Sequence, residues 1–294
     1  MATMEALERR IHSAEDLQSV VRTMKTLAAV SIRQYEAAVA ALGDYTRTLA
    51  VGFRMLRWLH PRDIPQPPSA RSGKLGSIVF GSDQGMCGSF NEQISDFVEE
   101  IVTDAEPDPS RRSYLLIGSR VAGRLEDRGA PIHRVFDVPG SVGGITQLVL
   151  ELLPVLQSWQ TNEELERVLV FHNTRQTEST YKPMHVRLLP LDPERLLHPR
   201  THRWPSRSLP LVTMNPGELY SRLIRQHLFV SLFRACAHSL AGENASRIAS
   251  MQAAERNIAD KLDELRDDWR QTRQKSITEE LLDVMTGFET LKDD

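Results

Sequence analysis

Apolar residues recur at every seventh position through the N-terminal part of the chain. The series runs without a polar member: Leu7, Ala14, Val21, Ala28, Tyr35, Leu42, Leu49 and Leu56. No proline occurs between Met4 and Leu59. A repeat of seven sustained over this length predicts a helix that winds left-handedly around a partner helix.

A second long stretch of helical character lies at the other end of the chain. From Asn215 to Leu291 the apolar residues recur at spacings of three and four, and Pro216 is the only proline. An unbroken helix of this length would measure about 110 Å. Ordinary helices of globular domains run to about 20 residues. We therefore expect the two terminal helices to pair with each other as an antiparallel coiled coil.

The pattern changes between these two stretches. Four prolines end the first helix: Pro61, Pro65, Pro67 and Pro68. Short apolar runs then alternate with amphipathic segments, and the runs predict strands at Leu75–Gly81, Tyr114–Gly118, Ile132–Phe136, Arg167–His172 and Met184–Leu191. A helix expected at about Thr146–Gln157 would break near Pro154. This alternation predicts a Rossmann-like α/β domain with a largely parallel sheet.

These patterns divide the chain into five segments. We expect an N-terminal coiled-coil helix at 1–60, a linker at 61–74, an α/β globular domain at 75–192, a loop at 193–214 and a C-terminal coiled-coil helix at 215–294. The fold class is therefore α/β, with a globular domain inserted between two long helices.

Composition excludes several classes of function. The net charge of -3 gives no overall basic character, so we expect no nucleic-acid partner. No apolar run of about 18 residues occurs, and the N-terminus lacks a hydrophobic signal core, so we expect a cytosolic-side protein that meets a membrane only through partners. The histidines and the two cysteines show no metal-binding spacing, and we expect no metal.

The turn after the first predicted strand is the position where α/β folds bind phosphate. It reads G-S-D-Q-G-M-C-G-S-F-N from Gly81, and it matches neither the G-x-G-x-x-G nor the G-x-x-x-x-G-K-[ST] fingerprint. A reactive Cys87 would need a nearby base, and the nearest histidines in sequence are His60 and His133. We therefore expect a structural turn without catalytic residues or cofactor, formed by Gly81, Asp83, Gly85, Cys87 and Gly88.

Four motifs of the chain resemble motifs of one known protein family. S-D-Q-G-M-C-G-S-F-N resembles that family's S-D-R-G-L-C-G-G-x-N, and V-V-R-T-M-K-T-L-A-A-V-S resembles I-T-K-A-M-x-M-V-A-A-S-K. Near the end, T-R-Q-K-S-I-T-E-E-L resembles A-R-Q-A-x-I-T-x-E-L, and A-G-E-N-A-S-R-I-A-S-M resembles A-S-E-x-x-A-R-M-x-A-M. The family that these motifs resemble is the gamma subunit of F-type ATP synthases. The motifs occur in the family's order, and the resemblance covers essentially the whole chain.

The second motif departs from the family at two places. The lysine after A-A-S is replaced by the run Val30-Ser31-Ile32, and Lys25 follows Met24 where an acidic or apolar residue is common. These departures look more like the divergent gamma subunits of an alternative bacterial ATPase type. The coupling ion, proton or sodium, does not follow from this chain.

The resemblance implies a non-catalytic subunit that serves as the rotor shaft. Its partners would be the alpha and beta subunits, the epsilon subunit and the ring of c subunits, at the cytoplasmic side of a bacterial inner membrane. The motif positions imply rotor–stator contacts at Arg273, Gln274, Thr278 and Glu280, which would bond to loops of the beta subunits, opposite Met24 and Lys25 on the first helix. The apolar tail, Val284, Phe288 and Leu291, would turn within an apolar collar.

Two other interpretations remain open from the residues. An α/β enzyme or nucleotide-binding protein with oligomerising helical arms would bind a nucleotide through its middle domain, near Asp83 or Cys87. A coiled-coil scaffold would instead self-associate through the heptad seam between residues 4 and 59.

Overall fold

The computed structural model describes residues 4–61, 73–163, 165–177, 180–191 and 211–290 of the chain. Most of the predicted linker at 61–74 and loop at 193–214 lie outside the described residues, as does Leu291. The described chain forms two compact units. The helix-pair unit comprises Met1–Ala28 with Ile248–Asp294, and the lobe unit comprises Ala29–Arg247.

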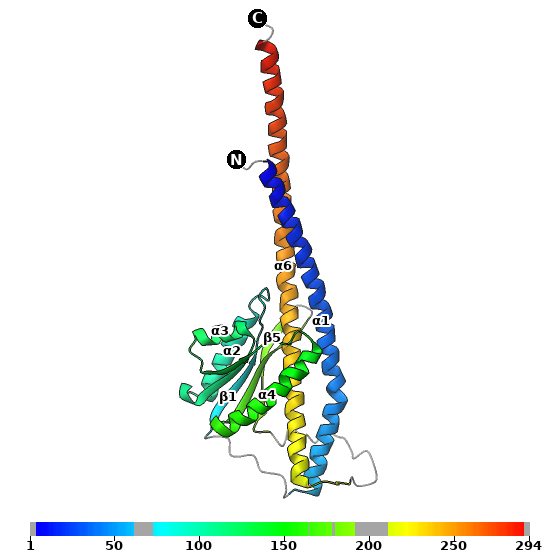
Figure 1. Ribbon diagram of the computed structural model, residues 1–294, viewed down its shortest axis with the longest axis vertical. Coiled ribbons are helices and arrows are strands. Elements are labelled where there is room, and N and C mark those ends of the chain that lie inside the picture. Colours follow the sequence, from blue (N-terminus) through cyan, green and yellow to red (C-terminus); the bar gives the residue numbers. More distant parts are fainter. Residues whose placement is uncertain (1–3, 62–72, 164, 178–179, 192–210, 291–294) are drawn as a thin grey trace. The chain divides into compact units, whose positions relative to one another are not determined.

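Two long helices contribute to both units (Figure 1). Helix α1 spans Met4–Leu59, and helix α6 spans Pro216–Thr290. The start of α6 follows from its first residues, because the Asn215 side chain accepts a hydrogen bond from the Gly217 amide at 2.9 Å. Pro216 occupies the first turn, where no backbone donor is needed.

Within the helix-pair unit the helices pack side by side in opposite directions. Side chains spaced by seven on α1 bond to α6 residues of decreasing number: Glu8 with Trp269, Glu15 with Arg266 and Arg22 with Glu255. Between them lie buried apolar residues from both helices, namely Leu7, Val21, Ala28, Met251, Leu262 and Leu265. This arrangement confirms the antiparallel pairing predicted from the heptad pattern.

The lobe unit contains a five-stranded sheet in the order β3-β2-β1-β4-β5. Strands β1 (Lys74–Phe80), β2 (Arg112–Ile117), β3 (Ile132–Phe136) and β4 (Leu165–Arg175) are parallel, and β5 (Tyr181–Leu189) runs antiparallel to β4. The helices between them are α2 (Phe90–Ala105), the short 3-10 helix η1 (Pro109–Arg111), α3 (Ser119–Asp127) and α4 (Val142–Glu163). The predicted Rossmann-like domain is therefore confirmed.

Both faces of this sheet are covered, which explains the continuous apolar runs of its central strands. Alternate residues of β1 enter two separate cores. Ile78 and Phe80 join a core shared with α4 and α6, whereas Leu75 and Val79 join one shared with α2 and α3. The α/β lobe, defined as β1–β5 with α2–α4, thus packs on the α6 segment of its own unit through the first of these cores.

Helix α4 differs from the sequence expectation. It continues past Pro154 to Glu163 instead of breaking there. Its buried residues Leu152, Leu153 and Leu156 flank the proline, so packing against the sheet offsets the lost backbone hydrogen bond. No described helix is long and apolar enough to cross a membrane.

Candidate functional site

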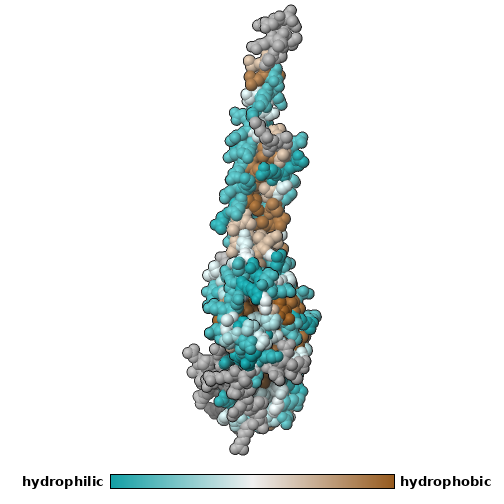
Figure 2. All heavy atoms as spheres, turned by 90° about the vertical axis from the view of Figure 1, so that its left-hand side faces the viewer, coloured by the Kyte–Doolittle hydropathy of each residue, from teal (hydrophilic) through white to brown (hydrophobic). Residues whose placement is uncertain are grey.

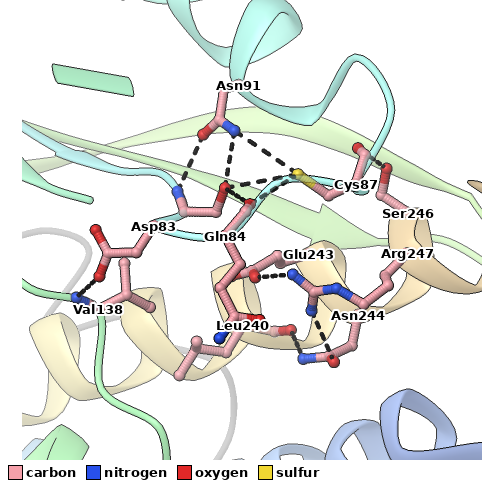
Figure 3. A network of polar contacts seen from close by, with 11 residues as sticks. Asp83, Gln84, Cys87, Asn91, Val138, Leu240, Glu243, Asn244, Ser246 and Arg247 are labelled. Atoms are coloured by element: carbon pink, nitrogen blue, oxygen red, sulfur yellow. Dashed lines mark hydrogen bonds and ion pairs between the residues drawn. The ribbon is translucent and has the colours of Figure 1, made fainter. Parts of the chain in front are cut away.

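Asp83 joins three loops at the carboxyl ends of the parallel strands. One carboxylate oxygen accepts a hydrogen bond from the Ser119 amide at 2.7 Å. The other accepts one from the Val138 amide at 2.7 Å (Figure 3). Ser119 begins α3 directly after β2, and Val138 follows β3. Because this carboxylate occupies the helix N-terminus, a phosphate approaching there would meet a negative charge.

Asn91 holds the rest of the turn in place. Its side chain accepts a hydrogen bond from the Ser82 amide at 3.0 Å and donates one to the Ser82 hydroxyl at 2.8 Å. Cys87 lies beside them and is buried. Burial raises the pKa of the Cys87 thiol, against a smaller opposing effect of its hydrogen bond with Ser82. A protonated thiol is a poor nucleophile, so the site does not resemble that of a cysteine enzyme.

The three glycines of the turn have different structural roles. A Cβ on Gly81 would lie 2.4 Å from Val121, so this position excludes a side chain. Gly88 has a φ of 54°, in the left-handed region that glycine adopts readily. At Gly85 a Cβ would come no closer than 3.6 Å to Arg120, and the geometry does not require glycine. Met86 adopts a φ of 60° while its side chain is exposed, a feature that the sequence did not suggest.

The predicted contact residue Lys25 is engaged within the chain. Its ammonium lies 2.5 Å from one oxygen of Glu255, and the Arg22 guanidinium lies 2.9 Å from the other. Hydrogen bonds from Lys25 and then Arg22 lower the pKa of Glu255 below its usual value. Met24 is half-buried beside them. Sequence reasoning missed Glu255, because only the folded helix pair brings it next to residues more than 200 positions away.

The predicted contact residues of α6 are exposed. Arg273, Gln274, Thr278 and Glu280 all face solvent, and the Arg273 guanidinium lies over the Trp269 ring. They do not lie across from Lys25. Lys25 faces Glu255, which lies eighteen residues before Arg273 on α6, or about 27 Å along the helix axis. The structure thus places the predicted contacts at two levels of the helix pair.

The end of α6 presents apolar side chains to solvent (Figure 2). Ile277, Leu281 and Val284 are 48%, 60% and 60% exposed. They continue the apolar repeat of α6, but the described part of α1 does not reach them, because Glu8, near its start, is already level with Trp269. Phe288 is part of α6, but its side chain lies outside the described residues.

More exposed apolar residues occur than the motifs indicated. Within the helix-pair unit they are Leu17, Val20 and Leu27 on α1 and Leu282 and Met285 on α6, all more than half exposed. Their spacing resembles that of seam residues, so the sequence alone does not separate a buried seam from a second, unpaired face. Exposed apolar surface of this kind is typical of a site where another protein packs.

The family model and the curated relatives cover nearly the whole chain. The family model described as ATP synthase matches residues 3–291. The ATP synthase gamma chain of Geotalea uraniireducens is 25% identical over 299 residues, covering 99% of this chain and 100% of the relative. The gamma chain of Thermosynechococcus vestitus is 25% identical over 320 residues, with the same coverage of each chain.

Solved structures share the fold at low sequence identity. A chain of the Euglena gracilis mitochondrial ATP synthase, from the OSCP/F1/c-ring structure, matches with a TM-score of 0.67 and 14% identity, covering 98% of this chain and 94% of that one. A chain of the Tetrahymena thermophila central stalk/c-ring matches with a TM-score of 0.56 and 17% identity, covering 80% and 99%. Because the family model matches nearly the full length of the chain, the chain belongs to the ATP synthase family, among the gamma chains.

Proposed function

We propose that this chain is the central rotor shaft of an F-type ATP synthase, coupling transmembrane ion flow to ATP synthesis or hydrolysis. Gamma chains are non-catalytic subunits, and catalysis resides in the beta subunits. The observation that carries the proposal is the exposed apolar end of α6, on a chain that matches gamma chains over its full length. Such a surface needs a protein around it.

An asymmetric shaft explains how identical catalytic sites can differ. A conformational shift at a site requires a ligand or partner that interacts differently with its two states. The surface of the helix pair is not uniform. It carries the charged cluster Arg22–Lys25–Glu255 and the exposed apolar residues Leu17 and Leu27, so a neighbouring subunit would meet different chemistry at different angles. Rotation would present each face to each beta subunit in turn.

The partners follow from the relatives. The similar Euglena chain belongs to a structure of OSCP, F1 and the c-ring, and the similar Tetrahymena chain to a central stalk with its c-ring. For this chain we infer alpha and beta subunits around the helix pair, and epsilon and c subunits against the lobe. As a gamma chain it would be attached peripherally to the membrane complex. We place that complex at the cytoplasmic side of a bacterial inner membrane.

We assign the rotor–stator contacts to the exposed positions of the motifs. Arg273, Gln274, Thr278 and Glu280 would bond to loops of the beta subunits, and Met24 would pack at a second level. Lys25 would act with Arg22 and Glu255 as one charged cluster, since its ammonium is already paired. Val284, Phe288 and Leu291 would sit in an apolar collar, where turning breaks no hydrogen bond.

Affinity purification from the native host tests the proposal. The tagged chain should bring down alpha, beta, epsilon and c subunits, and the purified material should hydrolyse ATP. Recovery of the folded chain alone would contradict the rotor function.

Alanine substitution then tests the assigned contacts. Changes at Arg273, Gln274, Thr278 and Glu280 should alter coupling or torque while the complex still assembles. Glu218, an exposed residue near the start of α6, offers a matched control. Unchanged ATP synthesis and hydrolysis in every contact variant would refute the assignment of these residues.

A further inference from the structure

Arg273, which we assigned to a stator contact, lies over an aromatic ring. Its guanidinium carbon is 5.3 Å from the centre of the Trp269 ring, about one helical turn earlier on α6. At this distance the positive group is attracted to the face of the ring in a cation–π interaction. None of the residues three or four positions from Arg273 is acidic, so α6 offers the guanidinium no ion pair of the usual helical spacing.

The Trp269 ring is in turn fixed by the other helix. Its indole N–H donates a hydrogen bond at 3.2 Å to the carboxylate of Glu8, close to the start of α1 (Figure 1). Trp269 is half-buried and follows the buried Leu262 and Leu265 at the spacing of the apolar seam. A ring that is packed on one side and hydrogen-bonded at its edge has little freedom to rotate. Glu8, Trp269 and Arg273 therefore form one connected series that begins on α1 and ends at an exposed charge on α6.

The two polar contacts of the ring reinforce each other. A carboxylate that accepts the indole N–H pushes electron density into the ring and makes its face more negative. A more negative face attracts the guanidinium more strongly. Glu8 thus favours the stacked position of Arg273 through the ring between them.

Stacking leaves the hydrogen-bonding edge of Arg273 available. A cation–π interaction uses the flat face of the guanidinium, whereas its N–H groups point outward in the plane of the group. The Arg273 side chain is exposed, so a neighbouring subunit can reach these N–H groups. A freely rotating arginine loses conformational entropy when it binds, and this loss weakens association. An arginine that is already held on a ring loses less.

We propose that Trp269 and Glu8 are positioning residues that hold the Arg273 guanidinium in place for its contact with a beta subunit. The inference rests on the rotor function proposed above. It adds two residues that lie outside the motifs of the sequence analysis, on two helices and 261 positions apart. Because the ring acts through the arginine, its removal should weaken association only while Arg273 is present.

A double-mutant cycle on the full-length chain tests this dependence. ATP hydrolysis is reconstituted from purified alpha and beta subunits by titration with the chain, and the chain concentration that gives half-maximal activity is measured. Wild type, Trp269→Leu, Arg273→Met and the double variant are compared. Leucine suits an apolar seam but has neither a ring face nor an N–H group. Methionine keeps much of the length of arginine without its charge.

We expect Trp269→Leu to raise the half-maximal concentration about three-fold in the wild-type background, the size of one exposed cation–π contact. In the Arg273→Met background the same change should have no effect. Trp269→Phe keeps a ring face without the N–H group, so its effect should be smaller than that of leucine. Glu8→Ala should also raise the concentration by a smaller factor, again only while Arg273 is present.

Arg270 supplies the matched control for the arginine. It is exposed, directly follows the tryptophan and pairs with Asp267. In the Arg270→Met background Trp269→Leu should keep its full effect on the half-maximal concentration. Circular dichroism checks that each variant is as helical as the wild type. Should Trp269→Leu fail to fold, Trp269→Phe takes its place in the same cycle.

Three results would overturn the inference. An equal effect of the tryptophan change with and without Arg273 would show that Trp269 serves only the seam. No effect of that change in the wild-type background would show that the guanidinium needs no support. No effect of Arg273→Met itself would remove the contact that the ring is proposed to prepare. A wild-type chain that restores no ATP hydrolysis would instead contradict the rotor function, so the two failures are distinguishable.

Discussion

Asp83 shows how one side chain organises a whole edge of the sheet. Its carboxylate accepts two charge-assisted hydrogen bonds from the loops after β2 and β3. We expect Asp83→Ala to lower the free energy of unfolding by about 2 kcal/mol, since both amides lose their acceptor. Urea unfolding of the purified chain measures this loss. Asp104→Ala, which removes an exposed carboxylate on α2, is the control, and an equal effect of both changes would contradict the role of Asp83.

His172 predicts how stability changes with pH. Burial lowers its pKa from 6.5 to about 4, opposed by its contact with the Asn173 carbonyl and assisted by His238, whose ring stacks on it. The pKa of His238 is also lowered, mainly by burial and to a smaller extent by the charge of Arg234, whereas the charge of Glu36 raises it. A histidine whose pKa is lowered by folding takes up its proton more readily in the unfolded chain. Stability should therefore fall as the pH drops from about 6.5 to about 4.

The change His172→Gln isolates this contribution. Because glutamine does not titrate, the variant should lose less stability than the wild type between pH 7 and pH 4. The difference is expected to approach about 3 kcal/mol, the value of a shift of this size. Urea titrations at several pH values measure it. Parallel pH profiles for the two proteins would show that another group is responsible.

The sequence predicts single residues only where a local motif constrains them. Three glycines after an apolar run predict a structural turn that contains Gly81 and Asp83. The bonds of Asp83 to Ser119 and Val138 were not foreseen, since those amides come from loops that only the folded sheet brings together. The pairing of Lys25 with Glu255 escaped for the same reason.

At the scale of elements, the heptad seam predicts which residues hold the helix pair together. Leu262 is buried between α1 and α6, whereas Leu281 is 60% exposed on the same helix. We expect Leu262→Ala to destabilise the pairing by about 2 kcal/mol, the lower end for a buried leucine. Hydrogen exchange of the α1 amides in residues 4–28 should then speed up. Leu281→Ala should leave these rates unchanged, and equal rates in both variants would contradict the seam.

The elements themselves were largely predictable, and their limits were not. Periodicity located both long helices and the five strands, because burial imposes a period of its own on each kind of element. Helix α4 continued past Pro154 because packing on the sheet outweighed the local penalty. The sequence of α6 also does not show at which residue its packing against α1 ends, because that residue depends on how the two helices align.

At the scale of the whole molecule, the carboxyl ends of the parallel strands argue against nucleotide binding, because the Asp83 carboxylate already occupies them. Asp83 holds the amides that a phosphate would use, and the Cys87 thiol is buried. We therefore expect the purified chain to show no saturable binding of magnesium ATP tighter than about 1 mM in calorimetric titration. Saturable binding that changes in the Asp83→Asn variant would favour a nucleotide-binding lobe. That conclusion would hold even if the chain also assembled into a complex.

The exposed apolar end of α6 yields the strongest test of what surrounds the helix. In solvent a charge at Leu281 or Val284 costs little, because both side chains are already wet. Inside an apolar collar the same charge would lose its water without gaining a partner. Leu281→Glu/Val284→Glu should thus leave the helix content and unfolding of the isolated chain unchanged.

The same double variant should weaken association with the alpha and beta subunits about ten-fold or more, equivalent to about 1.4 kcal/mol. Reconstitution of ATP hydrolysis from the separate subunits, titrated with the chain, measures this loss. Asp283→Lys, at an exposed polar position between the two, controls for a change of charge as such. Equal association of the double variant and the wild type would mean that no apolar collar encloses this segment. The rotor contacts would then have to lie nearer Arg273 and the Lys25–Glu255 cluster.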